Sequence, residues 1–326
     1  MACARTALIF KRAGWPAVVA LGGCFSMSPA PPDPALPPVD APGEMVIAQF
    51  DGAASPELET HWGADATFVL VHPTLDQRDV GWFIFDTGAS AWTISDTGAA
   101  RARLDAIGRA RIGGKDPTTV YACGRLDLGP LGLENVRMAG LNMGHASSAF
   151  GRDVVGICGS DVPRATIVEL DGRARRLALH DPSWSAPAET EWHPLVMCGN
   201  LPLVRCRYGA GAEGLFLIDT GSNGSIHLFA RATESLRARG ELAPFTDSRT
   251  QIVYGGPHTV DVGWLADFRV DDRSIGPVEA TFGRADEPIS ALPAEADGII
   301  GMRVLRDHVV LIDEPAGRVA FIGPRR

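Results

Sequence analysis

The amino-acid sequence predicts a mainly β protein whose body consists of two similar halves. Glycine and proline are frequent, at 37 and 24 of 326 residues, and both residue types end strands and form tight turns. Apolar, strand-like runs separated by such turns follow one another along the body, and few segments show helical spacing. One succession of strand, turn and strand also occurs twice, which indicates a duplicated unit.

Each half begins with a hairpin that ends in Asp-Thr-Gly. The first copy starts at Thr67 and reaches Trp82-Phe-Ile-Phe-Asp86 after a polar turn. The second starts at Leu201 and reaches Leu215-Phe-Leu-Ile-Asp219 after a glycine-rich turn. The apolar run before each aspartate is continuous rather than alternating. Such a run is typical of a strand that is buried on both faces.

The similarity continues after these hairpins. A helical stretch follows each motif, at residues 99–107 and 229–239, and a Gly-Gly pair comes next. Each copy then has an apolar-apolar-Gly segment, containing Gly156 or Gly298, and an apolar strand that reaches an aspartate. We therefore expect an N-terminal half over residues 46–185 and a C-terminal half over residues 186–326.

The first 24 residues are typical of a targeting segment. A basic start precedes a mostly apolar stretch, residues 13–21, which is too short to span a bilayer. Leu21-Gly-Gly-Cys24 then resembles the lipobox of bacterial lipoproteins. The segment therefore predicts export to the bacterial periplasm or cell envelope, lipidation at Cys24, and membrane attachment through the lipid alone. The alternative is an ordinary secretory signal in which Cys24 has no role.

The prolines that follow predict an extended tether over residues 25–45. The formal net charge of -9 argues against nucleic acid as a partner. We expect neither a metal nor another cofactor, because the cysteines lack C-x-x-C spacing and no histidine cluster accompanies them. Export would permit disulfides, and Cys198 and Cys206 are close enough to close a small loop. Buried free thiols are the alternative for these two and for Cys123 and Cys158.

The order of these motifs resembles that of the retropepsin-like and pepsin-like aspartic peptidases. The pattern occurs twice, over roughly residues 62–323, and its short copies are closer to a retropepsin unit. Gly298-Ile-Ile-Gly-Met-Arg-Val-Leu305 is especially similar to the bacterial retropepsin-type segment. The resemblance implies an aspartic-peptidase (retropepsin-like) fold, with two pseudo-twofold-related β-barrel-like halves in one chain. It also implies one active site on the axis, with one aspartate from each half, so that a monomer suffices.

A third Asp-Thr-Gly, at residues 96–98, has to be weighed against the other two. It follows Ile94-Ser95 rather than a long apolar run, and the second half has Phe229 at the corresponding distance from Asp219. Asp96 or Thr97 is instead a plausible N-cap for the helix expected next. The predicted catalytic pair is therefore Asp86 with Asp219.

Two neighbouring carboxyls suit peptide hydrolysis, because one can activate water while the other protonates the substrate. At about 4 Å and an effective dielectric constant near 20, two carboxylates repel each other by about 4 kcal/mol. This repulsion corresponds to roughly three pKa units, so one carboxyl stays ionised while its partner holds a proton. The sequence leaves open which of the two does so.

The residues around the aspartates have expected supporting roles. Gly88 and Gly221 allow the backbone to approach the carboxylates and to donate N–H groups to them. The resemblance implies that Thr87 and Thr220 each form a hydrogen bond across the axis to the opposite strand.

The two motifs differ in the residue after the glycine. It is Ser222 in the second motif and Ala89 in the first. We therefore expect the outer carboxylate oxygen of Asp219 to have a donor that Asp86 lacks.

The Gly-Gly pairs are candidates for flaps that close over the substrate. They comprise Gly113 and Gly114 in the first half, and Gly255 and Gly256 after Tyr254 in the second. Plain β-turns are the alternative. Tyr254 has two expected roles, donation of its hydroxyl to a bound peptide or cross-strand packing.

These features predict an aspartic endopeptidase that acts on a peptide or protein substrate. The alternative from another class is a non-catalytic, peptide-binding envelope lipoprotein that retains the fold. Intact Asp-Thr-Gly motifs in both halves argue against this alternative, because a binding module has no need to hold two carboxylates together.

Overall fold

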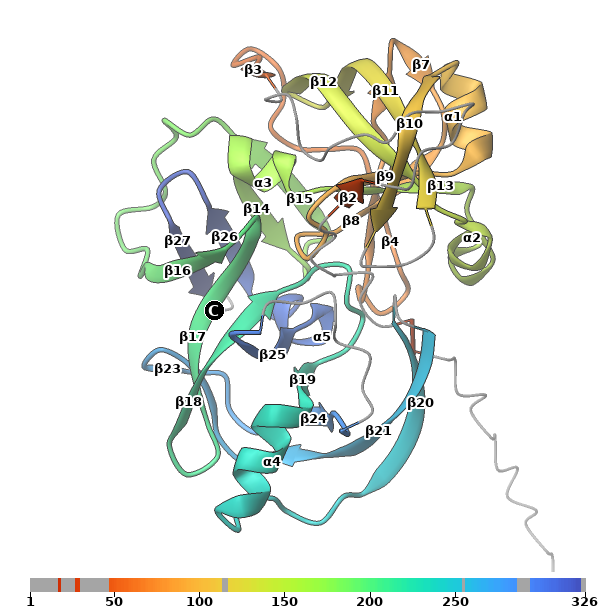
Figure 1. The fold of residues 1–326 in the computed structure, drawn as a ribbon. Helices are drawn as coiled ribbons and strands as arrows, with labels where there is room; N and C mark the ends of the chain where they lie inside the picture. Colours follow the sequence, from red (N-terminus) through yellow and green to blue (C-terminus); the bar gives the residue numbers. More distant parts are fainter. Residues whose placement is uncertain are drawn as a thin grey trace, which may run out of the picture.

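The computed structural model describes residues 17–18, 27–29, 47–112, 117–253, 256–285 and 294–323. Within these ranges the protein is mainly β, with two strongly curled sheets and a few short helices (Figure 1). The N-terminal half lies above the C-terminal half in this view. The prediction of a mainly β, two-halved protein is confirmed.

Seven strands form the path through the sheet of the N-terminal half that carries its Asp-Thr-Gly motif. They lie in the order β10–β11–β12–β9–β13–β8–β5. Their bounds are β5 (Val69–Val71), β8 (Trp82–Phe85), β9 (Trp92–Ile94), β10 (Asp105–Ile112), β11 (Pro117–Leu128), β12 (Leu131–Gly140) and β13 (Val154–Cys158).

The C-terminal half repeats this path strand for strand, in the order β20–β21–β24–β19–β25–β18–β17. Parallel pairs recur at the same places, β8 with β13 and β18 with β25, and β9 with β12 and β19 with β24. The duplication read from the sequence is therefore also a duplication of topology. The bounds are β17 (Leu201–Tyr208), β18 (Ala212–Ile218), β19 (Ile226–Leu228), β20 (Asp247–Val253), β21 (Gly256–Leu265), β24 (Val278–Phe282) and β25 (Ala296–Ile300).

The two halves share a third group of strands. Strands β14 (Ile167–Asp171) and β15 (Arg176–His180) from the first half continue through β26 (Val309–Asp313) and β27 (Arg318–Ile322) to β16 (His193–Cys198) from the second. Backbone pairing between β14 and β26 is antiparallel, with Leu170 opposite Val310. The halves are therefore joined by continuous hydrogen bonding and not only by side-chain packing.

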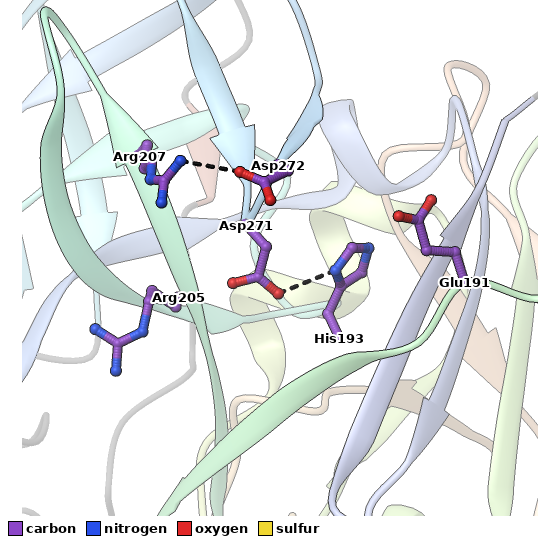
Figure 2. Close-up of a pocket in the computed structure, with 6 residues that line it drawn as sticks. All are labelled: Glu191, His193, Arg205, Arg207, Asp271 and Asp272. Carbon is purple, nitrogen blue, oxygen red and sulfur yellow. Dashed lines mark hydrogen bonds and ion pairs between the residues drawn. The ribbon is translucent and has the colours of Figure 1, made fainter.

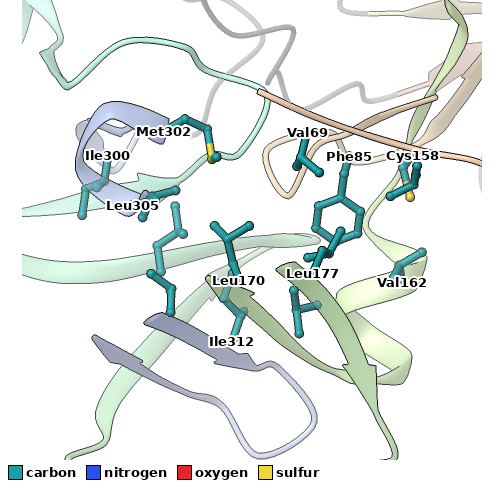
Figure 3. Packing of buried hydrophobic residues seen from close by; sticks show 14 of the residues in the cluster. Val69, Phe85, Cys158, Val162, Leu170, Leu177, Ile300, Met302, Leu305 and Ile312 are labelled. Atoms are coloured by element: carbon teal, nitrogen blue, oxygen red, sulfur yellow. The ribbon is translucent and has the colours of Figure 1, made fainter. Parts of the chain in front are cut away.

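The hydrophobic core is likewise shared across the halves. Figure 3 shows Phe85 and Leu170 from the first half in the same cluster as Ile300 and Ile312 from the second. Phe85 and Ile300 belong to the strands that lead to, or support, the two Asp-Thr-Gly motifs. Because these residues are closely packed in one core, the core fixes the positions of both motifs relative to each other.

The remaining elements are short and surround these sheets. The further strands are β1 (Ala17–Val18), β2 (Met27–Pro29), β3 (Ile47–Phe50), β4 (Thr60–Trp62), β6 (Thr74–Leu75), β7 (Arg78–Asp79), β22 (Phe268–Val270) and β23 (Arg273–Ser274). The helices are α1 (Asp96–Ala102), α2 (Gly144–Phe150), α3 (Asp161–Ala165), α4 (Ala230–Ala238) and α5 (Met302–Leu305).

One predicted helix agrees with the structure and the other has to be shortened. Helix α4 matches the stretch expected at residues 229–239 to within one residue at each end. The helix expected at residues 99–107 ends at Ala102, because Arg103 takes a left-handed conformation with φ of 58°. Strand β10 begins two residues later, at Asp105, so the last part of the predicted helix is strand.

The cysteines within the described residues, Cys123, Cys158, Cys198 and Cys206, are free thiols, so no disulfide closes the loop between Cys198 and Cys206. Cys198 lies beside the β16–β17 turn, opposite Leu201. Cys206 lies further along β17, where it pairs with Gly214 of β18. Because Cys206 lies several residues along β17 from the turn that holds Cys198, the two side chains are too far apart for a disulfide. Of the two, Cys206 is buried, as the alternative expected.

Cys24 and most of the predicted signal and tether lie outside the described residues. The two short segments that are described add strands to the outer hairpins, since β1 pairs with β20 and β2 pairs with β10. In the part of the chain that the structure describes, no helix is long and apolar enough to cross a membrane.

Candidate active site

The two predicted catalytic aspartates come directly after equivalent central strands. Asp86 follows β8 and Asp219 follows β18, and the side chains are 2% and 0% exposed. Each of these strands lies between two neighbours, β5 and β13 in one half and β17 and β25 in the other. Because each motif strand is hydrogen-bonded to neighbours on both sides, the position at which each aspartate leaves its strand is fixed by the sheet.

Threonines lock the two motifs together across the halves. The Thr87 hydroxyl donates to the Ile218 carbonyl at 2.7 Å and accepts from the Thr220 N–H at 3.2 Å. The Thr220 hydroxyl donates to the Phe85 carbonyl at 2.8 Å and accepts from the Thr87 N–H at 3.0 Å. This reciprocal set of four hydrogen bonds is the cross-axis role that the sequence resemblance implied for Thr87 and Thr220.

The two glycines bring each carboxyl against the opposite motif. A Cβ added at Gly221 would lie 2.3 Å from Cγ of Asp86, and one added at Gly88 would lie 2.7 Å from Cγ of Asp219. No real Cβ atom tolerates such distances, so both positions require glycine. The structure therefore brings Asp86 and Asp219 together, as predicted, with each carboxyl against the glycine of the opposite motif.

Substitution of Gly221 by alanine is expected to displace the Asp86 carboxyl. We expect any catalysis by the carboxyl pair to fall by about 100-fold, because displacements near 1 Å have effects of this size. Overpacking should also destabilise the fold by about 1–3 kcal/mol. Cleavage rate and thermal unfolding measure the two effects. Gly52→Ala is the matched control, since no atom lies within 4 Å of its added Cβ. Full activity of Gly221→Ala would contradict the proposed geometry.

Hydrogen bonding differs between the two carboxyls. Oδ1 of Asp86 accepts one backbone N–H, from Gly88 at 2.8 Å. Oδ1 of Asp219 accepts two, from Gly221 at 2.8 Å and from Ser222 at 3.0 Å. Among the described residues, no donor from outside the pair reaches Oδ2 of either aspartate, and both atoms are buried. A proton held by the pair is therefore the hydrogen available to bridge these two oxygens.

Burial and mutual repulsion perturb both acids, but not equally. Burial, followed by the nearby charge of Asp219, raises the pKa of Asp86 well above its ordinary value. Burial raises the pKa of Asp219 to about 6, while hydrogen bonds from Asp86, Gly221 and Ser222 oppose this rise. The two carboxyls titrate as a unit, and the order of their pKa values favours Asp86 as the carrier of a shared proton.

The prediction that the outer oxygen of Asp219 has an additional donor is wrong, because the additional hydrogen bond is made to Oδ1. Ser222 does distinguish the two motifs, but through its backbone N–H and at Oδ1. The Ser222 hydroxyl instead lies against Gly301, where an added Cβ would be 2.8 Å from Ser222 Oγ. The N–H of Ala89 donates to the Asp86 carbonyl at 3.3 Å, as that of Ser222 does to the Asp219 carbonyl, but no bond from Ala89 to the Asp86 carboxylate is present.

The third Asp-Thr-Gly lies at the start of helix α1, away from the carboxyl pair. The helix terminus was predicted, but the capping residue is Ser95, whose hydroxyl accepts from the Gly98 N–H at 3.1 Å. Asp96 is exposed in the first turn and accepts a hydrogen bond from the Tyr121 hydroxyl at 2.9 Å. A negative charge in the first turn interacts favourably with the positive end of the helix dipole and so stabilises the helix.

The hairpins expected to form flaps are present, although most of their tips are not described. Strands β10 and β11 pair up to Arg111 opposite Pro117, and β20 and β21 pair up to Val253 opposite Gly256. Gly113, Gly114, Tyr254 and Gly255 lie outside the described residues. Gly256 is the first residue of β21.

Gly156 and Gly298 allow three strands to pack closely behind the motifs. A Cβ at Gly156 would lie 2.3 Å from Cε1 of Phe83, and one at Gly298 would lie 2.2 Å from the His227 carbonyl oxygen. In each half the glycine-containing strand, β13 or β25, lies between the motif strand and β9 or β19.

Glu314 is a buried acid that sequence reasoning missed. It lies in the turn between β26 and β27, is 9% exposed, and burial raises its pKa to about 8. Neither carboxyl oxygen has a hydrogen-bond partner among the described residues. Its sequence context, Asp313-Glu314-Pro-Ala-Gly, reads as an exposed turn, so no local signal indicates burial.

No group of three or more His, Cys, Asp or Glu side chains within the described ranges is placed to hold a metal ion. A scan against protein-family models and a search of curated proteins returned no match for this chain. The carboxyl pair and its surroundings are therefore the basis for assigning a function.

Proposed function

We propose that this chain is a single-chain aspartic endopeptidase of the retropepsin-like kind, exported and attached to a membrane through lipid at Cys24. A monomer is sufficient, because both catalytic carboxyls come from one chain. The observation that carries the proposal is the buried pair formed by Asp86 and Asp219, each after an equivalent central strand and each against the glycine of the opposite motif. A structural protein has no evident use for two such costly groups.

The asymmetry of the pair suggests separate roles at the start of the reaction. Asp219, the more ionised partner, accepts a proton from a water molecule, and the resulting hydroxide oxygen bonds to the peptide carbonyl carbon. Asp86 donates its proton to the carbonyl oxygen, so that a neutral tetrahedral diol forms. Transfer of a proton to the leaving nitrogen then breaks the C–N bond and releases an amine and a carboxylic acid.

The substrate in this proposal is an extended peptide held between the β10–β11 and β20–β21 hairpins. An extended chain presents its N–H and C=O groups for backbone hydrogen bonding, which makes recognition largely independent of side chains. The recurrence of the hairpin in both halves supports two flaps rather than one.

The test is cleavage of an unstructured protein by the purified chain, with and without pepstatin. We expect cleavage that pepstatin slows. Cleavage by a retropepsin-like enzyme can be insensitive to this inhibitor, so the aspartate variants in the Discussion decide the mechanism. Absence of cleavage, together with retained binding of unstructured peptides, would favour the non-catalytic alternative.

The pH profile of cleavage tests the shared proton. The reaction needs the pair in its singly ionised form, so activity should rise as pH increases through about 6, where Asp219 ionises. Activity should fall again at higher pH, when Asp86 also loses its proton. Initial rates measured between pH 3 and 9 on one peptide give the profile. Maximal activity at pH 3 would contradict the assignment of roles.

A further inference from the structure

The N-terminal segment meets the folded body shortly after Cys24. Strand β2 pairs with the edge of β10 in the N-terminal half, with Met27 opposite Ile112 and Pro29 opposite Ala110 (Figure 1). Backbone pairing of this kind sets neighbouring strands about 5 Å apart. Residues 27–29 therefore lie along the outer edge of the β10–β11 hairpin, which is one of the two candidate flaps.

The connection that follows β2 returns to the same sheet. Strand β3 begins at Ile47 and pairs with β12, which belongs to the sheet that contains β2 and β10. Residues 30–46 therefore begin and end on one sheet. A connection of this kind adds nothing to the distance between Cys24 and the hairpin.

The chain between Cys24 and β2 limits how far the hairpin can lie from a lipid at Cys24. Only Phe25 and Ser26 separate Cys24 from Met27, and this length of chain spans at most about 10 Å. A free extended tether from Cys24 to Ile47 would span about 70 Å. Pairing of β2 with β10 thus decides whether the hairpin lies next to the bilayer or far from it.

Two further features fit an attachment through the first hairpin. Strand β1 pairs with β20 of the second hairpin, but it precedes Cys24, so cleavage at the predicted lipobox removes it. Arg111 lies opposite Ser28 and is exposed. A cation beside the anchor is attracted to anionic lipid headgroups.

We propose that β2 docks the β10–β11 hairpin at the membrane surface, so that the carboxyl pair cleaves membrane-attached polypeptides close to the bilayer. This inference rests on the proposed function, because it requires lipid at Cys24 and cleavage by the carboxyl pair. Substrate and enzyme on one bilayer meet at a high effective concentration, but only for peptide bonds within reach of the hairpin. The substrate class is therefore the juxtamembrane segment of an anchored protein.

A polar pocket of the C-terminal half provides a reference position away from the anchor. Its wall includes Arg205 of β17 and the hydrogen bond between His193 Nδ1 and Asp271 Oδ2, at 3.0 Å (Figure 2). Arg205 is exposed, and Figure 1 shows β17 well separated from β2 and β10. Arg111 and Arg205 are therefore matched exposed positions, one near the proposed membrane contact and one far from it.

Short-range fluorescence quenching tests the docking without relying on cleavage. The chain is purified from membranes, its lipid is confirmed by mass, and it is placed in vesicles with nitroxide-labelled headgroups. Arg111→Cys and Arg205→Cys carry the same fluorophore, and the chain without either substitution gives the background from the natural thiols. The label at position 111 should lose most of its fluorescence and the label at position 205 should keep it. An unquenched label at position 111, or a chain without lipid, would overturn the proposal.

Two equal insertions distinguish docking from a free tether. A Gly-Ser segment of about 20 residues between Phe25 and Ser26 has an end-to-end distance of about 25 Å, so it should remove the quenching at position 111. The same segment between Ala41 and Pro42 lies within residues 30–46 and should leave the quenching unchanged. Equal effects of the two insertions would show that β2 is not docked.

The substrate class is tested with a β-casein segment that the enzyme cleaves in solution. The segment is attached to the vesicles through stiff polyproline spacers of about 15 Å or about 90 Å. We expect the substrate with the short spacer to be cut at least about tenfold faster. The insertion after Phe25 should remove most of this preference, and the insertion after Ala41 should preserve it.

The outcomes separate this inference from the peptidase function. Equal cleavage rates on the two anchored substrates by the unmodified chain would overturn the proposed substrate class. Absence of cleavage in solution would instead reject the peptidase function, while the quenching at position 111 still decides whether the hairpin is docked.

Discussion

Replacement of either Asp86 or Asp219 by asparagine is expected to abolish peptide cleavage. The loss should be about 100- to 10,000-fold or greater, since each substitution removes a proton donor or acceptor from the reacting pair. Asparagine keeps the size of the side chain, so the loops and their threonine bonds should remain in place. Initial rates on an unstructured protein measure the effect.

Asp96→Asn is the control, because Asp96 belongs to the same three-residue motif but is exposed at the start of α1. We expect this variant to cleave at the unmodified rate. Cleavage activity that survives Asp219→Asn would contradict the proposed mechanism. Loss of activity in Asp96→Asn alone would mean that the wrong motif was chosen.

The same two variants should be more stable than the unmodified chain at neutral pH. Both aspartates have folded-state pKa values above the ordinary value. An acid of this kind destabilises the folded state once the pH exceeds its ordinary pKa, because the unfolded chain then releases a proton that the folded chain retains. A higher melting temperature combined with lost activity would separate a chemical role from a structural one.

Glu314→Gln is expected to stabilise the protein at neutral pH. Below about pH 4.5 Glu314 is protonated in both states and adds no pH dependence. Between pH 4.5 and about 8 the unfolded state loses this proton and the folded state keeps it, so stability falls as pH rises. At pH 7 the resulting loss in the free energy of unfolding is at most roughly 3 kcal/mol, and substitution by glutamine removes it.

Denaturant unfolding at pH 5 and pH 7 measures this effect. Glu314→Gln should raise the free energy of unfolding at pH 7 and reduce its fall between pH 5 and pH 7. Part of that fall should remain, because the aspartate pair also contributes to it. Asp313→Asn is the contrasting variant. Asp313 is also buried, but it accepts from Arg318 at 2.8 Å and from the Ala316 N–H at 3.1 Å, so its loss should destabilise. A destabilised Glu314→Gln would show that its carboxyl has a partner in solution.

Periodicity and repetition predicted most of the fold because they reflect local physics. Continuous apolar runs before Asp86 and Asp219 required buried strands, and the two copies of each feature predicted equivalent positions for both aspartates. Rejection of Asp96 came from the same comparison. The end of helix α1 was harder to predict, since its last turn depends on the left-handed conformation of Arg103 and not on composition.

Other features depended on contacts between distant segments. The sequence by itself determined the duplication, the choice of Asp86 with Asp219, and the need for glycine beside each. Only the tertiary structure decided how strongly burial and pairing raise the pKa values of the two aspartates. It also decided that Glu314 is buried and that His193 meets Asp271, 78 residues away. Burial and desolvation are properties of the packed interior, and no local run of residues reports them.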